Sequence, residues 1–197
     1  MPFITINQRI SYIEASDNPL SADIGVIQGD GGVWLYDVGN GEKSLSGLTG
    51  EYHVVLSHFH ADHTGNIQRI QAKALYVSKE TYAHVHRGAI LQGDMYIGDM
   101  HIFPLPSSHT KGCLGLEVGE SYAFVGDALY CKAKDGFYVY NAQLLQDEIA
   151  VLSALRSPYL LVSHYKGLIR KKEDVLEELK AIYAMREKGA PEIKIKY

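Results

Sequence analysis

The feature that most constrains this chain is a run of metal-binding side chain types directly after an apolar segment. Residues 57–65 read Ser-His-Phe-His-Ala-Asp-His-Thr-Gly, and the apolar residues before them are typical of a buried strand. Six positions of this run hold four groups that commonly bind metals: His58, His60, Asp62 and His63. A catalytic metal needs about three protein ligands and one open position. The run supplies two ligands for each of two ions, so the fold must bring the others from elsewhere.

Three further potential ligands each follow an apolar segment. His109 comes after Phe-Pro-Leu-Pro-Ser-Ser, Asp127 after Phe-Val-Gly, and His164 after Leu-Leu-Val-Ser. The end of a strand holds the backbone rigidly, so side chains at such positions can converge on one centre. An accidental polar loop is the competing interpretation of residues 57–65, and the three later partners argue against it.

Hydrophobic patterning predicts mainly strands in the first third of the chain and strands mixed with helices afterwards. The predicted strands are residues 3–7, 10–14, 24–28, 33–36, 53–56, 74–77, 159–162 and 193–196, with strand pairs at 95–104 and 116–125. The predicted helices are residues 64–70, 79–87, 141–155 and 172–186. This order allows an α+β fold in which two packed sheets are covered by helices, a four-layer αββα sandwich. We expect one domain spanning residues 1–197.

The spacing His58-x-His60-x-Asp62-His63, followed in order by His109, Asp127 and His164, resembles the metallo-β-lactamase superfamily. It is most similar to the glyoxalase II-type hydrolases of that superfamily. The resemblance implies the αββα sandwich of the metallo-β-lactamase fold. It also implies two metal sites, the first bound by His58, His60 and His109. The second would be bound by Asp62, His63 and His164, with Asp127 bridging the two ions.

The resemblance includes one further residue, and the chain differs from two members of the superfamily. Asp37, in Trp-Leu-Tyr-Asp-Val-Gly, resembles the aspartate that supports the metal site from behind, although a turn former is the alternative interpretation. The true β-lactamases carry a cysteine where this chain has Asp127, which disfavours antibiotic hydrolysis. Glyoxalase II has a further C-terminal helical region that binds glutathione, and the chain ends soon after His164, so glutathione thioesters are not the expected substrate.

The expected chemistry is hydrolysis by a hydroxide that bridges two divalent cations, whose charge lowers its pKa towards neutrality. Asp62 and Asp127 are the expected catalytic residues, since Asp62 can orient the proton of the hydroxide and Asp127 can fix the separation of the ions. The ligands offer nitrogen and oxygen, which favours zinc and also permits manganese or iron. The net positive centre should favour an anionic or carbonyl-containing small molecule.

The choice between carbon esters and phosphorus esters depends on a proton donor for the leaving group. A histidine is the usual donor to a leaving alkoxide, and residues 128–163 contain none. We therefore expect a thioester, ester or lactone as the substrate. The alternatives are a phosphodiesterase or nuclease on the same centre, an iron-dependent redox enzyme, and a metal-binding module without turnover. Side chains that can replace the donor or hold a phosphate are Tyr130, Tyr138, Tyr140, Lys132, Lys134, Lys166 and Arg170.

Charge and composition argue against several other classes. A formal net charge of -4 disfavours general nucleic-acid binding, and no apolar stretch approaches the length of a membrane span. The N-terminal residues show no signal peptide, so we expect a cytoplasmic protein. Cys113 and Cys131 are expected to be buried free thiols. The histidines expected to be surface or packed residues rather than ligands are His53, His84, His86 and His101.

Overall fold

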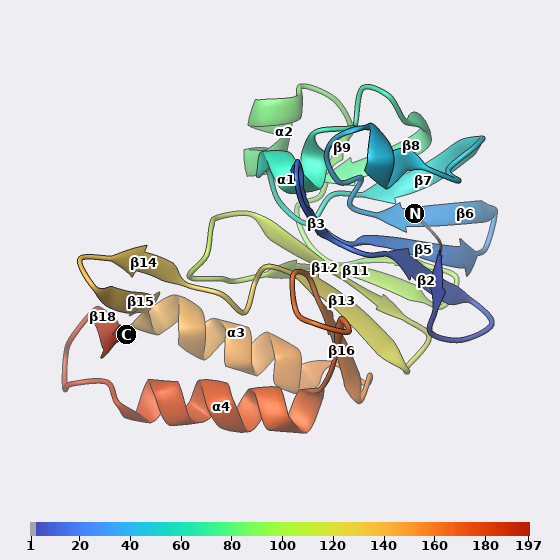
Figure 1. Ribbon diagram of the computed structural model, residues 1–197. Coiled ribbons are helices and arrows are strands. Elements are labelled where there is room, and N and C mark those ends of the chain that lie inside the picture. The colour runs from blue at the N-terminus through green and yellow to red at the C-terminus, as the bar shows by residue number, and fades with distance from the viewer. Residues whose placement is uncertain (1–2) are drawn as a thin grey trace.

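A computed structural model describes residues 3–197 and shows two large β-sheets packed face to face (Figure 1). The first sheet has the strand order β1 (Ile4–Thr5), β2 (Ile10–Ile13), β5 (Ile24–Gly29), β6 (Gly32–Tyr36), β7 (Glu51–Val55), β8 (Gln71–Val77) and β9 (Ala89–Ile90). The second has the order β10 (Met95–Ile97), β11 (Met100–Leu105), β12 (Cys113–Val118), β13 (Tyr122–Gly126), β16 (Tyr159–Val162) and β17 (Ile169–Lys171).

Helices cover the outer face of each large sheet. The first sheet carries η1 (Glu42–Leu45), α1 (Ala61–Thr64) and α2 (Lys79–Val85). The second carries α3 (Ala142–Ala154) and α4 (Lys172–Ala184), which lie side by side at the bottom of Figure 1. The α+β class and the αββα sandwich are therefore confirmed. Within residues 3–197, none of the helices combines the length and the apolar character needed to cross a membrane.

Three apolar layers hold the sandwich together. The middle layer lies between the sheets and contains Trp34 and Val55, the upper layer contains Val54, and the lower layer contains Leu145 of α3 and Val175 of α4. Successive side chains of a strand point to opposite faces, so Val54 and Val55 of β7 serve different layers. A strand that is buried on both faces needs an unbroken apolar run, which is why such runs precede the predicted ligands.

Parallel pairing brings four strand ends to one edge of the sandwich. β6 pairs in parallel with β7 in the first sheet, and β13 pairs in parallel with β16 in the second. Strands that run in the same direction end at the same edge. The residues just past these ends are Asp37, Ser57, Asp127 and Ser163. This edge therefore collects most of the predicted ligands.

Most of the predicted elements are present, with their bounds shifted by a few residues. The strands predicted at 24–28 and 33–36 are β5 and β6, which form a hairpin through the glycine-rich segment 29–32, with φ of 78° at Gly31. The helix predicted at 64–70 is wrong. The helix begins earlier, at Ala61, because the carbonyl oxygen of His60 accepts from the backbone N–H of both His63 and Thr64, and residues 66–69 form turns.

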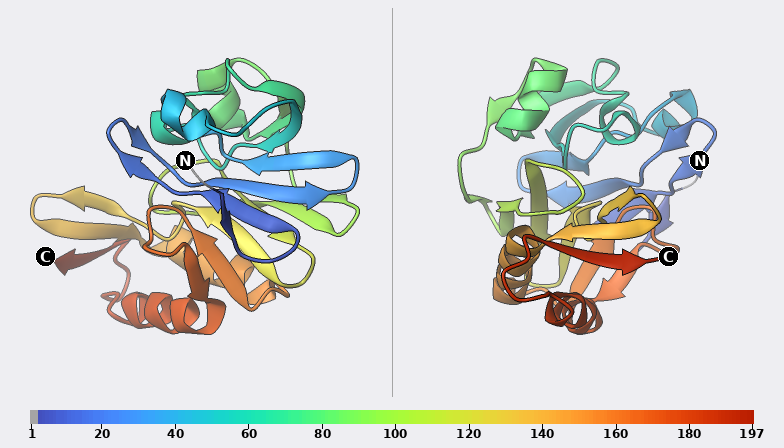
Figure 2. Two further views of the ribbon diagram at one scale, coloured as in Figure 1. Left: turned by 45° about the vertical axis from the view of Figure 1, so that its right-hand side comes forward. Right: turned by 90° about the vertical axis from the view of Figure 1, so that its left-hand side faces the viewer.

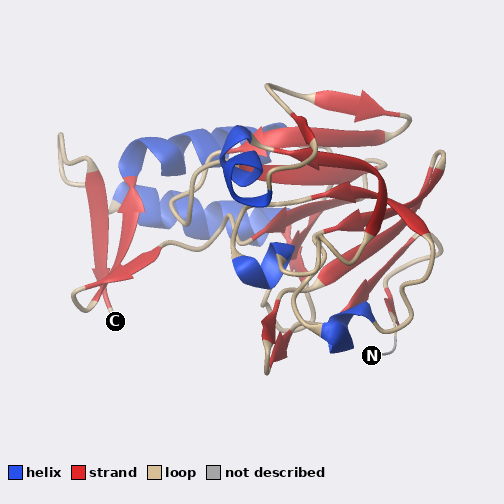
Figure 3. Cartoon of the chain, turned by 90° about the horizontal axis from the view of Figure 1, so that it is seen from above, coloured by secondary structure: helices blue, strands red, loops and turns tan. Residues whose placement is uncertain are grey.

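Two small sheets were not predicted. β3 (Ser16–Asp17) and β4 (Leu20–Ser21) form a hairpin, and β14 (Lys132–Lys134), β15 (Phe137–Asn141) and β18 (Glu192–Lys196) form a three-stranded sheet. The three-stranded sheet projects from one end of the sandwich and brings the C-terminal strand beside the hairpin that follows Asp127 (Figures 2 and 3).

Candidate metal centre

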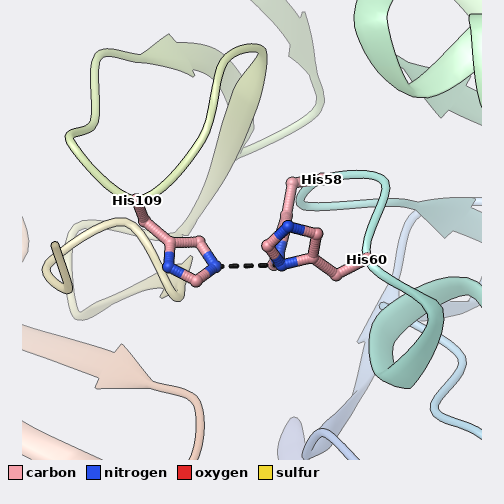
Figure 4. Close-up of side chains that lie close together, drawn as sticks. All are labelled: His58, His60 and His109. Carbon is pink, nitrogen blue, oxygen red and sulfur yellow. Dashed lines mark hydrogen bonds between the residues drawn. The ribbon is translucent and has the colours of Figure 1, made fainter. Parts of the chain in front are cut away.

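Three histidine side chains, carried by loops of both large sheets, converge at this edge (Figure 4). His58 and His60 follow β7, and His109 lies in the loop between β11 and β12. Nε2 of His109 is 3.1 Å from Nδ1 of His60, and the ring centroid of His58 is 4.5 Å from that of His60. Two nitrogens bound tetrahedrally to one zinc ion, each at about 2.0–2.1 Å, would be about 3.4 Å apart. The group therefore has the dimensions of a site for one cation.

A second group lies beside the first. Asp62 and His63 belong to α1, and His164 follows β16. Oδ2 of Asp62 is 3.0 Å from Nε2 of His164 and 3.6 Å from Nε2 of His63. One ligand atom from each of these residues and from Asp127 lies within 4.8 Å of the others. This group also has the dimensions of a cation site.

Asp127 lies between the two groups. Its Oδ2 atom is 3.5 Å from Nε2 of His109 and 3.4 Å from Nε2 of His63. One carboxylate oxygen thus contacts a histidine of each group, which is the position expected of a bridging ligand. All seven predicted residues are brought together in this way, and their assignment as ligands stays a prediction.

Buried atoms without partners show that the donor set suits metal ions. Among the described residues, Nε2 of His58, Nε2 of His63 and Oδ1 of Asp127 have no hydrogen-bond partner. An unpaired buried polar group costs about 1–3 kcal/mol. Divalent cations would satisfy these atoms, and imidazole and carboxylate ligands suit zinc, manganese and iron. The residues present therefore fit two divalent ions.

No protein-family model matches the chain, and no curated protein matches it. Solved structures do. DIM-1 metallo-β-lactamase aligns with a TM-score of 0.69 and 16% identity, over 93% of this chain and 96% of that chain. A B3 metallo-β-lactamase with an active-site glutamic acid aligns with a TM-score of 0.67 and 14% identity, over 94% and 90%. MIM-1 metallo-β-lactamase from Novosphingobium pentaromativorans aligns with a TM-score of 0.67 and 13% identity, over 94% and 89%.

The chain has the metallo-β-lactamase fold. Identities of 13–16% establish a shared fold and nothing finer. The similarity to glyoxalase II-type hydrolases stays a prediction from the residue pattern.

Within this metallo-β-lactamase fold, Asp37 supports the second group from behind. Its Oδ2 atom is 2.7 Å from Nδ1 of His63 and accepts a 2.7 Å hydrogen bond from Oγ of Ser57. Its Oδ1 atom accepts from the backbone N–H of Ser57 at 2.7 Å. A histidine whose Nδ1–H faces a carboxylate presents Nε2 to a metal in a fixed orientation. Asp37 is therefore more than a turn former.

Sequence reasoning missed a second buried aspartate, Asp23. Its Oδ2 atom accepts from the backbone N–H of His164 at 2.9 Å, and its Oδ1 atom accepts from that of Ala15 at 3.0 Å. Asp23 follows the β3–β4 hairpin, far from His164 in the chain. No local motif could have signalled this contact, because it depends on how the first sheet meets the loop after β16.

The pKa values of the second group, which contains Asp62, His63, Asp127 and His164, are shifted by the charges within it. Burial would lower the pKa of His63, but the carboxylates of Asp37 and Asp127 outweigh it and raise the pKa to about 10. The hydrogen bond with Asp62 raises the pKa of His164. Burial opposes ionisation of Asp62, yet its interactions with His164 and His63 lower its pKa. The field in this group thus favours positive charge, whether that charge is a proton or a metal ion.

A cleft of ≈ 580 Å³ opens next to the loops that carry the first group, although its lining includes none of the seven predicted ligands. One wall consists of Phe59 and His84, whose rings stack at 4.1 Å with an interplanar angle of 9°. The loop that carries His109 forms another part of the lining, through Ser107, Ser108, Thr110 and Lys111. His84 was expected to be a surface or packed histidine, and it is exposed in the wall of this cleft. The spacing of residues within helix α2 could not show that this helix faces the loop that carries His109.

The other residues set aside as non-ligands lie away from the two groups. His53 stacks on Trp34 and His101 stacks on Tyr96, with ring centroids 4.6 Å and 4.3 Å apart. His86 ends α2 in a left-handed conformation. Both cysteines are free thiols, but only Cys113 is buried, and Cys131 is half-buried. The expectation of two buried thiols was therefore wrong for Cys131, which lies where the chain leaves the core for the projecting sheet.

Proposed function

We propose that this protein is a metal-dependent hydrolase that uses two divalent cations, with zinc as the first candidate. One observation carries the proposal: a carboxylate oxygen of Asp127 lies between two donor groups, each with the dimensions of a cation site. The metallo-β-lactamases with the same fold support it. Bound cations would lower the pKa of water and polarise a carbonyl or phosphoryl oxygen.

The chain itself holds and orients the reactants. Asp62 keeps a partly exposed carboxylate at the centre, where it can accept a proton from the attacking water and orient it. Asp127 sets the separation of the two groups. Ser57 supplies no nucleophile, because its hydroxyl donates to the buried carboxylate of Asp37.

The substrate we propose is a thioester, ester or lactone. Its support is that residues 128–163 contain no histidine and that the hydroxyl of Tyr130, one of the candidate donors there, is already engaged. The hydroxyl of Tyr130 donates to the carbonyl oxygen of Ser163 at 2.7 Å, and the ring of Tyr138 packs against Tyr197 with centroids 4.8 Å apart. The thiolate of a thioester leaves with less protonation than the alkoxide of a phosphodiester, because a thiol has an ordinary pKa of about 8.5.

Phosphodiester hydrolysis is the second candidate, and His84 is the observation that favours it. This histidine lies in the wall of the cleft and stacks on Phe59, the residue between His58 and His60 in the chain, outside the stretch where a donor was sought. It can protonate a leaving alkoxide if the substrate lies along that wall.

Paired substrates separate the two candidates. We would measure kcat/KM for a simple thioester, a lactone and a dinucleotide phosphodiester, whose alkoxide leaving group needs protonation, with protein reloaded to the same content of zinc, manganese or iron. We expect thioester or lactone hydrolysis to exceed phosphodiester hydrolysis. The matched variant is His84→Gln, which should leave thioester turnover within about twofold. A preference for the phosphodiester that His84→Gln abolishes would establish the second candidate. Lack of turnover on every substrate, with two ions bound, would contradict the hydrolase proposal.

A further inference from the structure

We propose that the projecting three-stranded sheet binds a phosphate-bearing carrier to which the acyl group of the substrate is attached. This proposal rests on the hydrolase function proposed above and names the substrate class of the same site: a thioester of a nucleotide-linked thiol. In the reaction, water adds to the thioester carbonyl and the carbon–sulfur bond breaks. The products are a carboxylic acid and a thiol, and the thiolate takes one proton of the water.

Strand register places four lysines on one face of this sheet. Lys132 lies opposite Val139, which lies opposite Lys194, and Lys134, Phe137 and Lys196 form the next row. Residues opposite one another in an antiparallel sheet point to the same side. We call this surface the lysine face, formed by Lys132, Lys134, Phe137, Val139, Lys194 and Lys196. Glu192 lies on the same face, with its Oε2 atom 3.5 Å from Nζ of Lys194.

The opposite face of this sheet packs against the body of the protein at its inner end. This opposite face carries Tyr140 and Ile193, and Ile193 is buried in the apolar layer that α3 and α4 cover. All four lysines are exposed, whereas Phe137 and Val139 are half-buried between them. A positively charged surface with an apolar centre is therefore presented to solvent.

This surface is continuous with the cleft beside the candidate metal centre. Lys132 and Val139 line the cleft of ≈ 580 Å³ together with Ser108, the neighbour of His109 in the chain. Val139 also lines the next hollow outward, of ≈ 140 Å³, together with Lys134 and Lys194. A ligand on the lysine face can therefore extend into the cleft without a break.

The charge balance favours a small ligand with a few phosphates. The two hollows are lined by four lysines, Lys111, Lys132, Lys134 and Lys194, and by three acidic side chains, Glu80, Asp135 and Glu192. Lys196, which lies on the same face outside the hollows, brings the excess to two positive charges. The chain as a whole carries -4, so the excess is local. Strands of this length span about 17 Å, the size of a nucleotide with a short arm. Phe137 offers a ring on which a base can stack.

Direct binding tests the lysine face without relying on turnover. The probes are adenosine 3′,5′-bisphosphate and uncharged adenosine, titrated calorimetrically into metal-loaded protein. We expect the bisphosphate to bind more tightly, and Lys132→Gln/Lys194→Gln to weaken it about 5- to 30-fold, with an effect that shrinks at high salt. The matched control is Lys171→Gln/Lys180→Gln, which removes two lysines from a different hollow. Equal loss in both variants, or none in either, would overturn the proposal.

A second titration, with an oligonucleotide, tests whether the ligand of the lysine face is a nucleic acid rather than a small phosphorylated carrier. If a single-stranded decanucleotide binds far more tightly than the bisphosphate, and this binding is lost in Lys132→Gln/Lys194→Gln, the ligand is a nucleic acid and the carrier proposal is wrong. Comparable or weaker binding of the decanucleotide supports a small phosphorylated ligand.

Kinetics then distinguish this proposal from the hydrolase proposal. Acetyl-coenzyme A and S-acetyl-N-acetylcysteamine contain the same thioester bond, and only the first carries phosphates. We expect a lower KM for acetyl-coenzyme A, which Lys132→Gln/Lys194→Gln raises about 5- to 30-fold with kcat unchanged. Equal KM values for two hydrolysed substrates would overturn the role of the lysine face and leave the hydrolase intact. If neither thioester is hydrolysed although bisphosphate binding depends on the lysines, thioester hydrolysis is wrong and the phosphate surface stands.

Discussion

Two residues at the candidate metal centre adopt a backbone conformation that is rare outside glycine. Asp37 has a φ of 62° and His164 a φ of 60°. Such conformations cost about 1–3 kcal/mol each and persist only where their surroundings fix them. The backbone N–H of Asp37 donates to the carbonyl oxygen of Val55, and that of His164 donates to the carboxylate of Asp23. The same hydrogen bonds that stabilise these conformations also orient the side chains at the strand ends.

Asp37 orients a predicted ligand, whereas Asp127 and His60 are predicted ligands themselves. This difference gives the first prediction. Asp127→Ala and His60→Ala should remove activity more completely than Asp37→Ala, because the first two would each remove a predicted ligand atom. Loss of a residue that orients a ligand typically costs about 10–100-fold. The measurement is kcat/KM together with metal content for each purified variant.

Asp37 is also buried, so its replacement must be separated from unfolding. Asp37→Asn keeps the shape of the side chain, and thermal unfolding of both Asp37 variants would show whether the fold survives. If a folded Asp37→Ala protein were as inactive as Asp127→Ala, Asp37 would contribute more to the centre than the orientation of His63.

Among the elements, helix α3 is unusual because it contains a carboxyl group that is buried in the folded protein. Its Glu148 is 1% exposed, and Oε1 has no hydrogen-bond partner among residues 3–197. Burial raises the pKa of Glu148 well above its usual value of 4.5. The folded protein therefore holds a proton on Glu148 at pH values where the unfolded chain releases it. Stability that depends on this proton is complete below about pH 4.5 and is lost progressively as the pH rises.

Glu148→Gln should therefore stabilise the protein at neutral pH. Glutamine has nearly the same shape and leaves a similar unpaired group, but it needs no proton to remain uncharged. We expect a higher urea midpoint than for the unchanged protein at pH 7.5, with a gain that shrinks as the pH falls towards 5. A difference between the two proteins that stays constant over this range would show that Glu148 does not remain protonated in the folded state.

The elements also show which parts of the structure could be predicted from the sequence. The ligand run at 57–65 could be predicted because the strand end and the ligands are adjacent in the chain. The start of the helix predicted at 141–155 agrees with the structure, where Asn141 caps α3 by accepting from the backbone N–H of Leu144. The strand predicted at 193–196 is present as β18, but β14, β15 and their pairing with β18 were not predicted, because these strands are mostly exposed and β18 is distant from them in the chain. Asp23 and His84 were missed for the same reason: tertiary packing alone brings them to the site.

At the scale of the whole molecule, the candidate centre joins the two sheets. His58, His60, Asp62 and His63 follow a strand of the first sheet, whereas His109, Asp127 and His164 follow strands of the second. Each donor group draws residues from both sheets. Cations bound there would link the halves of the sandwich at the edge where the strands end.

Metal removal should therefore change stability as well as activity. We predict about two ions per chain by elemental analysis after reloading with zinc or manganese, given the two donor groups. A ligand that binds only the folded state at 100 times its Kd adds about 2.7 kcal/mol. In a chain of this size that shift raises the melting temperature by about 5–10 °C.

The contrast between one ion and two is the sharpest form of this test. Asp127→Asn keeps the shape of the side chain but withdraws the charge that lies between the groups, so it should lower both the ion count and the rise in melting temperature on reloading. The matched control is Asp135→Asn in the exposed turn between β14 and β15, which should bind and respond as the unchanged protein does. A maximum near one ion, or a melting temperature unaffected by chelator, would mean that the seven residues do not form a dinuclear clamp between the sheets.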